Sequence, residues 1–204
     1  MRRFGWAVMM ALATFIALYA VTLLFWETPR APFLRDRFRT IPLAATLHLL
    51  GSAIALATGP FQHNARIRNN SFLRHRWLGR AYVLGVAGGG IAALAMARVS
   101  QFGLMTHLGF GLLAILWLGT TAMAYQSIRA GDQERHRRWM TRSFALTFAA
   151  VTLRIYLPLS LAAGIRFEPA YQAISWLCWV PNLIVAEWII FRRREATLLE
   201  QRAA

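Results

Sequence analysis

The sequence contains no lysine, a single cysteine and few acidic residues, and each shortage disfavours a class of site. All 23 basic residues are arginine, aspartate and glutamate together number 8, and the formal net charge is +15. Cys178 is alone, so a disulfide framework and a thiolate metal site are excluded. No nucleophile, base and orienting acid share one level of the predicted helices, which disfavours a hydrolase. No basic stripe carries stacking aromatic residues, which disfavours nucleic-acid binding.

Apolar sequence is abundant, at 57% of the chain. Runs of about 20 apolar residues recur along it, and a helix of that length crosses a hydrocarbon core of roughly 30 Å. We therefore predict an all-α integral membrane protein in a lipid bilayer, with six transmembrane helices at residues 4–26, 42–60, 75–98, 103–128, 140–163 and 173–191. The first run is long for a signal peptide and lacks a small-x-small cleavage site, so we predict an uncleaved helix.

The arginine distribution predicts the orientation of these helices. Six spans place both termini on one side of the membrane, and that side carries 16 arginines against 6 on the other, with Arg154 inside the fifth span. Because cytoplasmic segments are enriched in basic residues, we predict that both termini are cytoplasmic. The segment 30–39 contradicts this pattern with four arginines, and it leaves a different orientation of the first helix open.

Two segments of the chain are near-copies of each other. Residues 75–82 read HRWLGRAY and residues 136–144 read HRRWMTRSF, while residues 46–51 read TLHLLG and residues 106–109 read THLG. The spacing from His48 to His107 is 59 residues, and that from His75 to His136 is 61. We therefore predict a single domain in which residues 42–98 and 104–163 are a duplicated helix pair. Its four helices form a central bundle, and the first and last helices pack outside.

Four of the five histidines occupy matched positions of this repeat. His48 and His107 enter their helices from the outer side, whereas His75 and His136 lie at the inner ends. A quasi-twofold axis would set His48 opposite His107 and His75 opposite His136, the layout that two bis-histidine haems need. The alternative for His75 and His136 is contact with lipid headgroups, and for the other two a structural partner or a substrate.

Arginines accompany these histidines. Arg154 stands roughly 21 Å from the inner start of its helix, close to the level of His48. It would meet a haem propionate, or else backbone carbonyls, Asn182 or a substrate carboxylate. We expect Glu187 to pair with Arg80 or Arg142, the matching arginines of the repeat.

The residues that carry the repeat also carry a resemblance. The sequence resembles a family of bacterial predicted membrane proteins designated domain of unknown function 2306, at residues 59–62, 75–80, 136–140, 142–143, 149–158 and 179–182. This likeness implies the inner membrane of a bacterium and no activity. The histidine layout is also similar to that of six-helix, two-haem cytochromes b, which take electrons from ascorbate or quinol. That likeness implies His48, His107, His75 and His136 as axial ligands of two haems b, with Arg154, Arg80 and Arg142 beside the cofactors.

The favoured expectation is transmembrane electron transfer through two b-type haems, supplied by a quinol or another small reductant. A second hypothesis is a small transporter or ligand-binding membrane protein in which Arg154, His48, His107 and Asn182 line a cavity for an anion. A third is a non-catalytic accessory membrane subunit. Bound haem would separate the first hypothesis from the others.

Overall fold

The computed structural model describes residues 3–28, 30–64 and 71–203, and within them every regular element is a helix. The helices are α1 (Arg3–Phe25), α2 (Pro32–Thr40), α3 (Pro42–Gln62), α5 (Phe72–Arg98), α6 (Gly103–Arg129), α7 (Gln133–Thr147), α8 (Ala149–Ala162), α9 (Phe167–Leu177) and α10 (Val180–Ala203).

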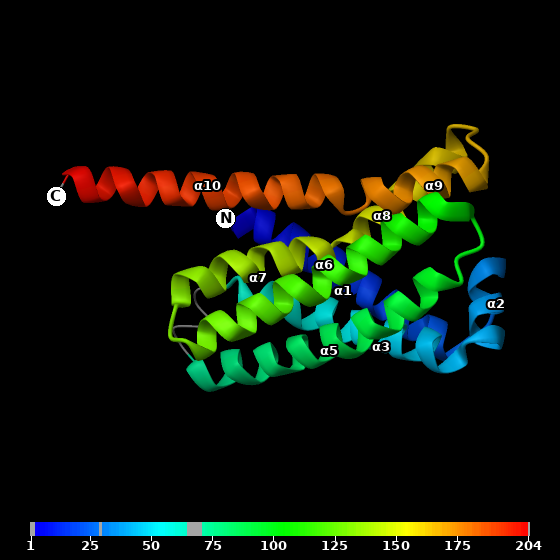
Figure 1. Ribbon diagram of the computed structural model, residues 1–204, viewed down its shortest axis with the longest axis horizontal. Helices are drawn as coiled ribbons and strands as arrows, with labels where there is room; N and C mark the ends of the chain where they lie inside the picture. Colours follow the sequence, from blue (N-terminus) through cyan, green and yellow to red (C-terminus); the bar gives the residue numbers. More distant parts are fainter. Residues whose placement is uncertain (1–2, 29, 65–70, 204) are drawn as a thin grey trace.

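Six stretches of helix are long and apolar enough to cross a membrane. Four are α1, α3, α5 and α6, and the other two are α7 continued by α8 and α9 continued by α10. The prediction of an all-α protein with six spans is confirmed. Both termini lie at the same end of the molecule, where α10 projects past the other helices (Figure 1).

The centre of the fold is a ring of four helices. α3 packs on α5, α5 on α6, α6 on α7, and α7 on α3, while α1 packs outside on α3 and the last two helices pack on α6 and α7. The closest approach is between α3 and α5, where a Cβ atom built on Gly51 would lie against Gly85 and 2.7 Å from the amide nitrogen of Gly89. Glycine is required there because the two backbones touch.

The helices α5 and α7 begin in the same way. Ser71 caps α5 by accepting the Arg74 amide at 3.4 Å, and Asp132 caps α7 by accepting the Arg135 amide at 2.8 Å. Such side-chain caps satisfy amides that a helix start leaves unpaired. Both caps lie four residues before a repeat histidine, so the helices extend further than the apolar pattern indicates.

Two spans are interrupted, and one side chain joins the interruptions. The fifth span breaks at Phe148 and the sixth at Trp179, with Pro181 in the first turn of α10. The Asn182 amide donates to the carbonyls of Ala145 at 3.3 Å and Cys178 at 2.9 Å, and to the Thr152 hydroxyl at 2.9 Å. Asn182 thereby joins the sixth span to residues on both sides of the break in the fifth span.

The polar connection between the first two spans contains a helix, α2, at residues 32–40. Pro32 starts this helix with a backbone angle that suits a first turn. Figure 1 shows α2 crossing the end of the bundle opposite the termini. Arg30 donates to the carbonyls of Leu23 at 2.8 Å and Leu24 at 3.2 Å, at the end of α1. At least part of the unexpected arginine cluster therefore serves the fold.

Candidate functional site

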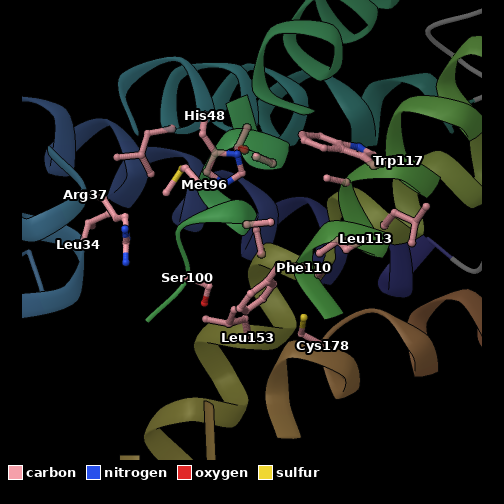
Figure 2. Close-up of a pocket in the computed structure, with 18 of the residues that line it drawn as sticks. Leu34, Arg37, His48, Met96, Ser100, Phe110, Leu113, Trp117, Leu153 and Cys178 are labelled. Carbon is pink, nitrogen blue, oxygen red and sulfur yellow. The ribbon is translucent and has the colours of Figure 1, made fainter. Parts of the chain in front are cut away.

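A cavity of about 240 Å³ lies inside the bundle, in the half nearer α2. Side chains from α2, α3, α5, α6, α7, α8 and α9 form its walls. Figure 2 shows His48 facing Leu153 and Cys178 across the space, with Arg37 and Trp117 at opposite ends. Most of the lining is apolar and includes Leu34, Leu49, Met96, Phe110, Leu113, Trp117, Leu146, Leu153 and Cys178.

Three side chains that can carry positive charge line this cavity: Arg37, His48 and Arg154. Among the described residues, no aspartate or glutamate lines it. A group of cationic side chains in apolar surroundings, without a lining carboxylate, favours a ligand of negative charge.

Arg37 reaches the cavity because α2 lies across the bundle end. The arginine is only 8% exposed, and its guanidinium lies 3.9 Å from the Asp36 carboxylate, which is outside the lining. Asp36 also accepts a hydrogen bond of 2.7 Å from Gln101, in the connection between α5 and α6. The hydrogen bond between Gln101 and Asp36 holds α2 at this end of the cavity, because it joins α2 to the connection between α5 and α6.

Arg154 extends from α8, six residues beyond the break at Phe148. Its guanidinium donates to the Ala150 carbonyl at 2.9 Å and lies 5.5 Å from the centre of the Tyr19 ring. Within the described part of the chain, no carboxylate forms an ion pair with it. A guanidinium has five donors in a planar fork, so Arg154 keeps capacity for an anionic ligand.

His48 completes the charged wall from α3. Its Nδ1 lies 3.0 Å from the Gly89 carbonyl oxygen, and Nδ1 must carry the proton for this hydrogen bond. In the neutral ring, Nε2 is then an acceptor. His48 and Arg154 line the same cavity, from α3 and α8 respectively.

Two lining residues, Trp117 and Thr147, belong to a closed network of buried side chains. Trp117 donates to the Thr147 hydroxyl at 2.8 Å, Thr147 and Ser143 each lie 2.7 Å from the Tyr82 hydroxyl, and Ser143 lies 2.7 Å from Thr121. Thr121 donates to the Trp117 carbonyl at 2.8 Å, so the chain of donors can run from the indole of Trp117 back to its own carbonyl. Networks in which every member is satisfied rigidify a core.

His107 is not among the lining residues. It is the fifth residue of α6, and its Nδ1 lies 2.7 Å from the Ala97 carbonyl at the end of α5. Asn182 does not line the cavity either, and its side-chain amide bonds to residues at the two helix breaks. The structure therefore places His48 and Arg154 together and separates them from His107 and Asn182.

The other predicted pair lies at the opposite end of the bundle, together with a histidine that the repeat did not include. His63 ends α3 and interacts electrostatically with His75 and His136. The His136 Nδ1 lies 2.8 Å from the Ala124 carbonyl, and the His63 ring lies 5.2 Å from the ring of Phe144. Among the described residues, no three His, Cys, Asp or Glu side chains are placed to hold a metal ion.

Burial, together with the positive potentials of Arg193, His136 and His75, lowers the pKa of His63 to about 4. This histidine is therefore neutral at physiological pH, unlike the ordinary histidine with a pKa near 6.5. It serves as a packed ring at the end of the bundle.

The matching arginines have different partners. Arg142 donates twice to the Glu187 carboxylate, at 2.5 and 2.8 Å, which confirms one of the two partners predicted for Glu187. Arg80 is exposed and lies 4.7 Å from the Trp77 ring centre, and Arg142 lies 4.6 Å from that of Trp139. The repeat thus conserves a cation–π pair at this end of both helices.

The sequence reasoning missed Arg37, Trp117, Thr147 and Tyr171 as lining residues. The sequence did contain an indication for Arg37, because the segment 30–39 carries four arginines on the side of the membrane where few are expected. No signal existed for the other three, which read as ordinary members of apolar spans.

Comparison with known proteins identifies a family and no activity. A sequence model of the family described as "Predicted membrane protein (DUF2306)" matches residues 45–190, which cover three of the six spans in full and most of two others. No curated protein matches the chain. No solved structure matches it either.

Proposed function

We propose, from the premise that this chain belongs to the DUF2306 family of predicted membrane proteins, that it binds a small amphipathic anion inside the membrane. The observation that carries the proposal is the cavity wall, where Arg37, His48 and Arg154 face otherwise mostly apolar surroundings without a lining carboxylate. The anionic group would lie between Arg154 and His48, and the apolar part would lie along α6.

The cavity volume limits the ligand. An apolar cavity of about 150 Å³ holds one benzene molecule, so by proportion about 240 Å³ has room for about ten non-hydrogen atoms. A short aliphatic carboxylate has this size and polarity. Octanoate is a suitable probe, and octanamide is its neutral counterpart of equal atom number.

The test measures thermal unfolding of the full chain in an uncharged detergent as each probe is added. Octanoate is expected to raise the unfolding midpoint, since a ligand at 100 times its Kd stabilises the folded state by about 2.7 kcal/mol. Octanamide is expected to have little effect. Equal stabilisation by the two probes would contradict an anion site.

The variant Arg154→Gln tests whether Arg154 binds the anionic group of the ligand. Loss of a charge-assisted contact of about 1.5–3 kcal/mol predicts octanoate binding that is roughly ten- to a hundredfold weaker. Arg98→Gln is the matched control, because Arg98 is an exposed arginine at the same end of the bundle and does not line the cavity. If both variants bind octanoate as the wild type does, the cavity is not the site.

Electron transfer through two haems stays a second candidate. One observation favours it: the Nδ1 atoms of His48, His107 and His136 all bond backbone carbonyls, which leaves Nε2 available, as in histidines that ligate metals. Two observations oppose it, since the cavity is small for a haem and His107 does not line it. A b-type band on dithionite reduction of the purified protein would support haem, and a colourless folded protein would refute it.

We also propose that the termini face the cytoplasm of a bacterium, from the 16 arginines on their side of the bilayer. Contacts of Arg30 and Arg37 with α1 and the cavity explain why arginines of the opposite segment need not reverse this orientation. Fluorescent protein fused to the C-terminus should then fluoresce, and alkaline phosphatase fused there should be inactive. The reverse result would invert the orientation.

A further inference from the structure

A second pocket lies between α7 and α10, near the end of the bundle that carries the termini. Its volume is about 390 Å³, and it is lined by four arginines, Arg135, Arg138, Arg142 and Arg194, and by one carboxylate, Glu187. The two walls come from segments that lie far apart in the sequence, so only the folded chain assembles this charge.

Most of the positive charge in this pocket is available to a ligand. Glu187 is engaged by both donors of Arg142, which leaves three lining arginines without a carboxylate in the lining. Arg138 also lies 4.0 Å from Glu134, but both side chains of this pair are exposed, and such surface pairs contribute little.

The apolar part of the lining indicates the kind of anion. Trp139, Ile190 and Phe191 lie beside the arginines, and Phe191 is 64% exposed. A tryptophan next to arginines at the end of a membrane span is typical of the level of lipid headgroups. A small soluble anion has no apolar part that could contact these residues, whereas a phospholipid has both a phosphate and acyl chains.

We propose that this pocket binds the phosphate of an anionic phospholipid, with Arg135, Arg138 and Arg194 around the headgroup and Phe191 against the first part of an acyl chain. Basic pockets between transmembrane helices bind phosphate-bearing lipid headgroups in this way. The inference is independent of the anion cavity, which lies in the other half of the bundle.

The test uses the full chain in uncharged detergent and measures the unfolding midpoint against added dioctanoyl phosphatidylglycerol. Dioctanoyl phosphatidylcholine, which has the same chains and no net charge, and glycerol 3-phosphate, which has the phosphate and no chains, are the comparison probes. Phosphatidylglycerol is expected to stabilise at concentrations where neither comparison probe does. Equal effects of the two lipids would overturn the anionic specificity, and equal binding of glycerol 3-phosphate would overturn the lipid as the source of the phosphate.

The double variant Arg138→Gln/Arg194→Gln assigns the effect to the pocket. At about 1 kcal/mol for each arginine, we expect phosphatidylglycerol to bind about thirtyfold more weakly. The matched control is Arg76→Gln/Arg129→Gln, which removes two exposed arginines from the same end outside the pocket. The proposal fails if the two double variants lose the same affinity. Octanoate binding should survive in both.

Discussion

Replacement of Tyr82 by phenylalanine tests whether the closed hydrogen-bond network supports the cavity wall. Tyr82 is fully buried on α5, and its hydroxyl lies 2.7 Å from both Ser143 and Thr147 on α7. The ring stays in place in the variant, so the change removes the hydroxyl alone. Thr147 lines the cavity, so a weaker network should also affect the ligand site.

The expected cost follows from what each partner keeps. The Thr147 hydroxyl still accepts a hydrogen bond from the Trp117 indole, and it can donate to the Ser143 carbonyl at 3.0 Å. Ser143 can still donate to Thr121 at 2.7 Å. No buried donor is left unpaired, so the penalty of about 1–3 kcal/mol for an unsatisfied group does not apply in full. Hydrogen bonds between membrane helices average about 0.6 kcal/mol, and two of them predict a loss of about 1 kcal/mol.

The measurement is the free energy of unfolding in mixed micelles titrated with sodium dodecyl sulfate. Tyr125→Phe is the control, because Tyr125 is 50% exposed and lies outside the network. A double-mutant cycle of Tyr82→Phe with Ser143→Ala should give a coupling energy near 0.6 kcal/mol. Zero coupling, or a cost of Tyr82→Phe equal to that of Tyr125→Phe, would refute the network as a stabilising unit.

Two further predictions concern packing and pH. Gly51→Ala should destabilise the fold by about 1–3 kcal/mol or prevent it from assembling, because the added methyl group would meet backbone atoms of Gly85, whereas Gly88→Ala, with no atom within 4 Å, should cost nothing in the same titration. The low pKa of His63 predicts a loss of stability as the pH falls from about 7 towards 4, because the unfolded chain binds the proton first. His63→Gln should reduce that pH dependence, and an unchanged profile would assign it to other groups.

The site was only partly predictable from the sequence. His48 and Arg154 were chosen as ionisable residues inside apolar spans, and the structure places them in one cavity. Their grouping with His107 assumed that matched residues of a repeat face each other across an axis. In the fold α5 lies between α3 and α6, and His107 bonds to the end of α5 instead. The spacing of matched residues in the sequence could not reveal this, because it does not specify which neighbouring helix each helix packs against.

The sequence by itself determined the six spans, because only a continuous helix satisfies the backbone of an apolar segment in lipid. It also placed Ser71 and Asp132 four residues before His75 and His136, and in the structure each of them caps a helix. The tertiary structure alone decided the breaks in the last two spans and which helices surround the cavity. It also decided that Arg37 reaches inside and that α7 and α10 share an arginine pocket. The physical reason is that residues close together in the sequence determine whether a segment forms a helix and where the helix begins. A cavity, in contrast, is the space left between helices that are distant in sequence.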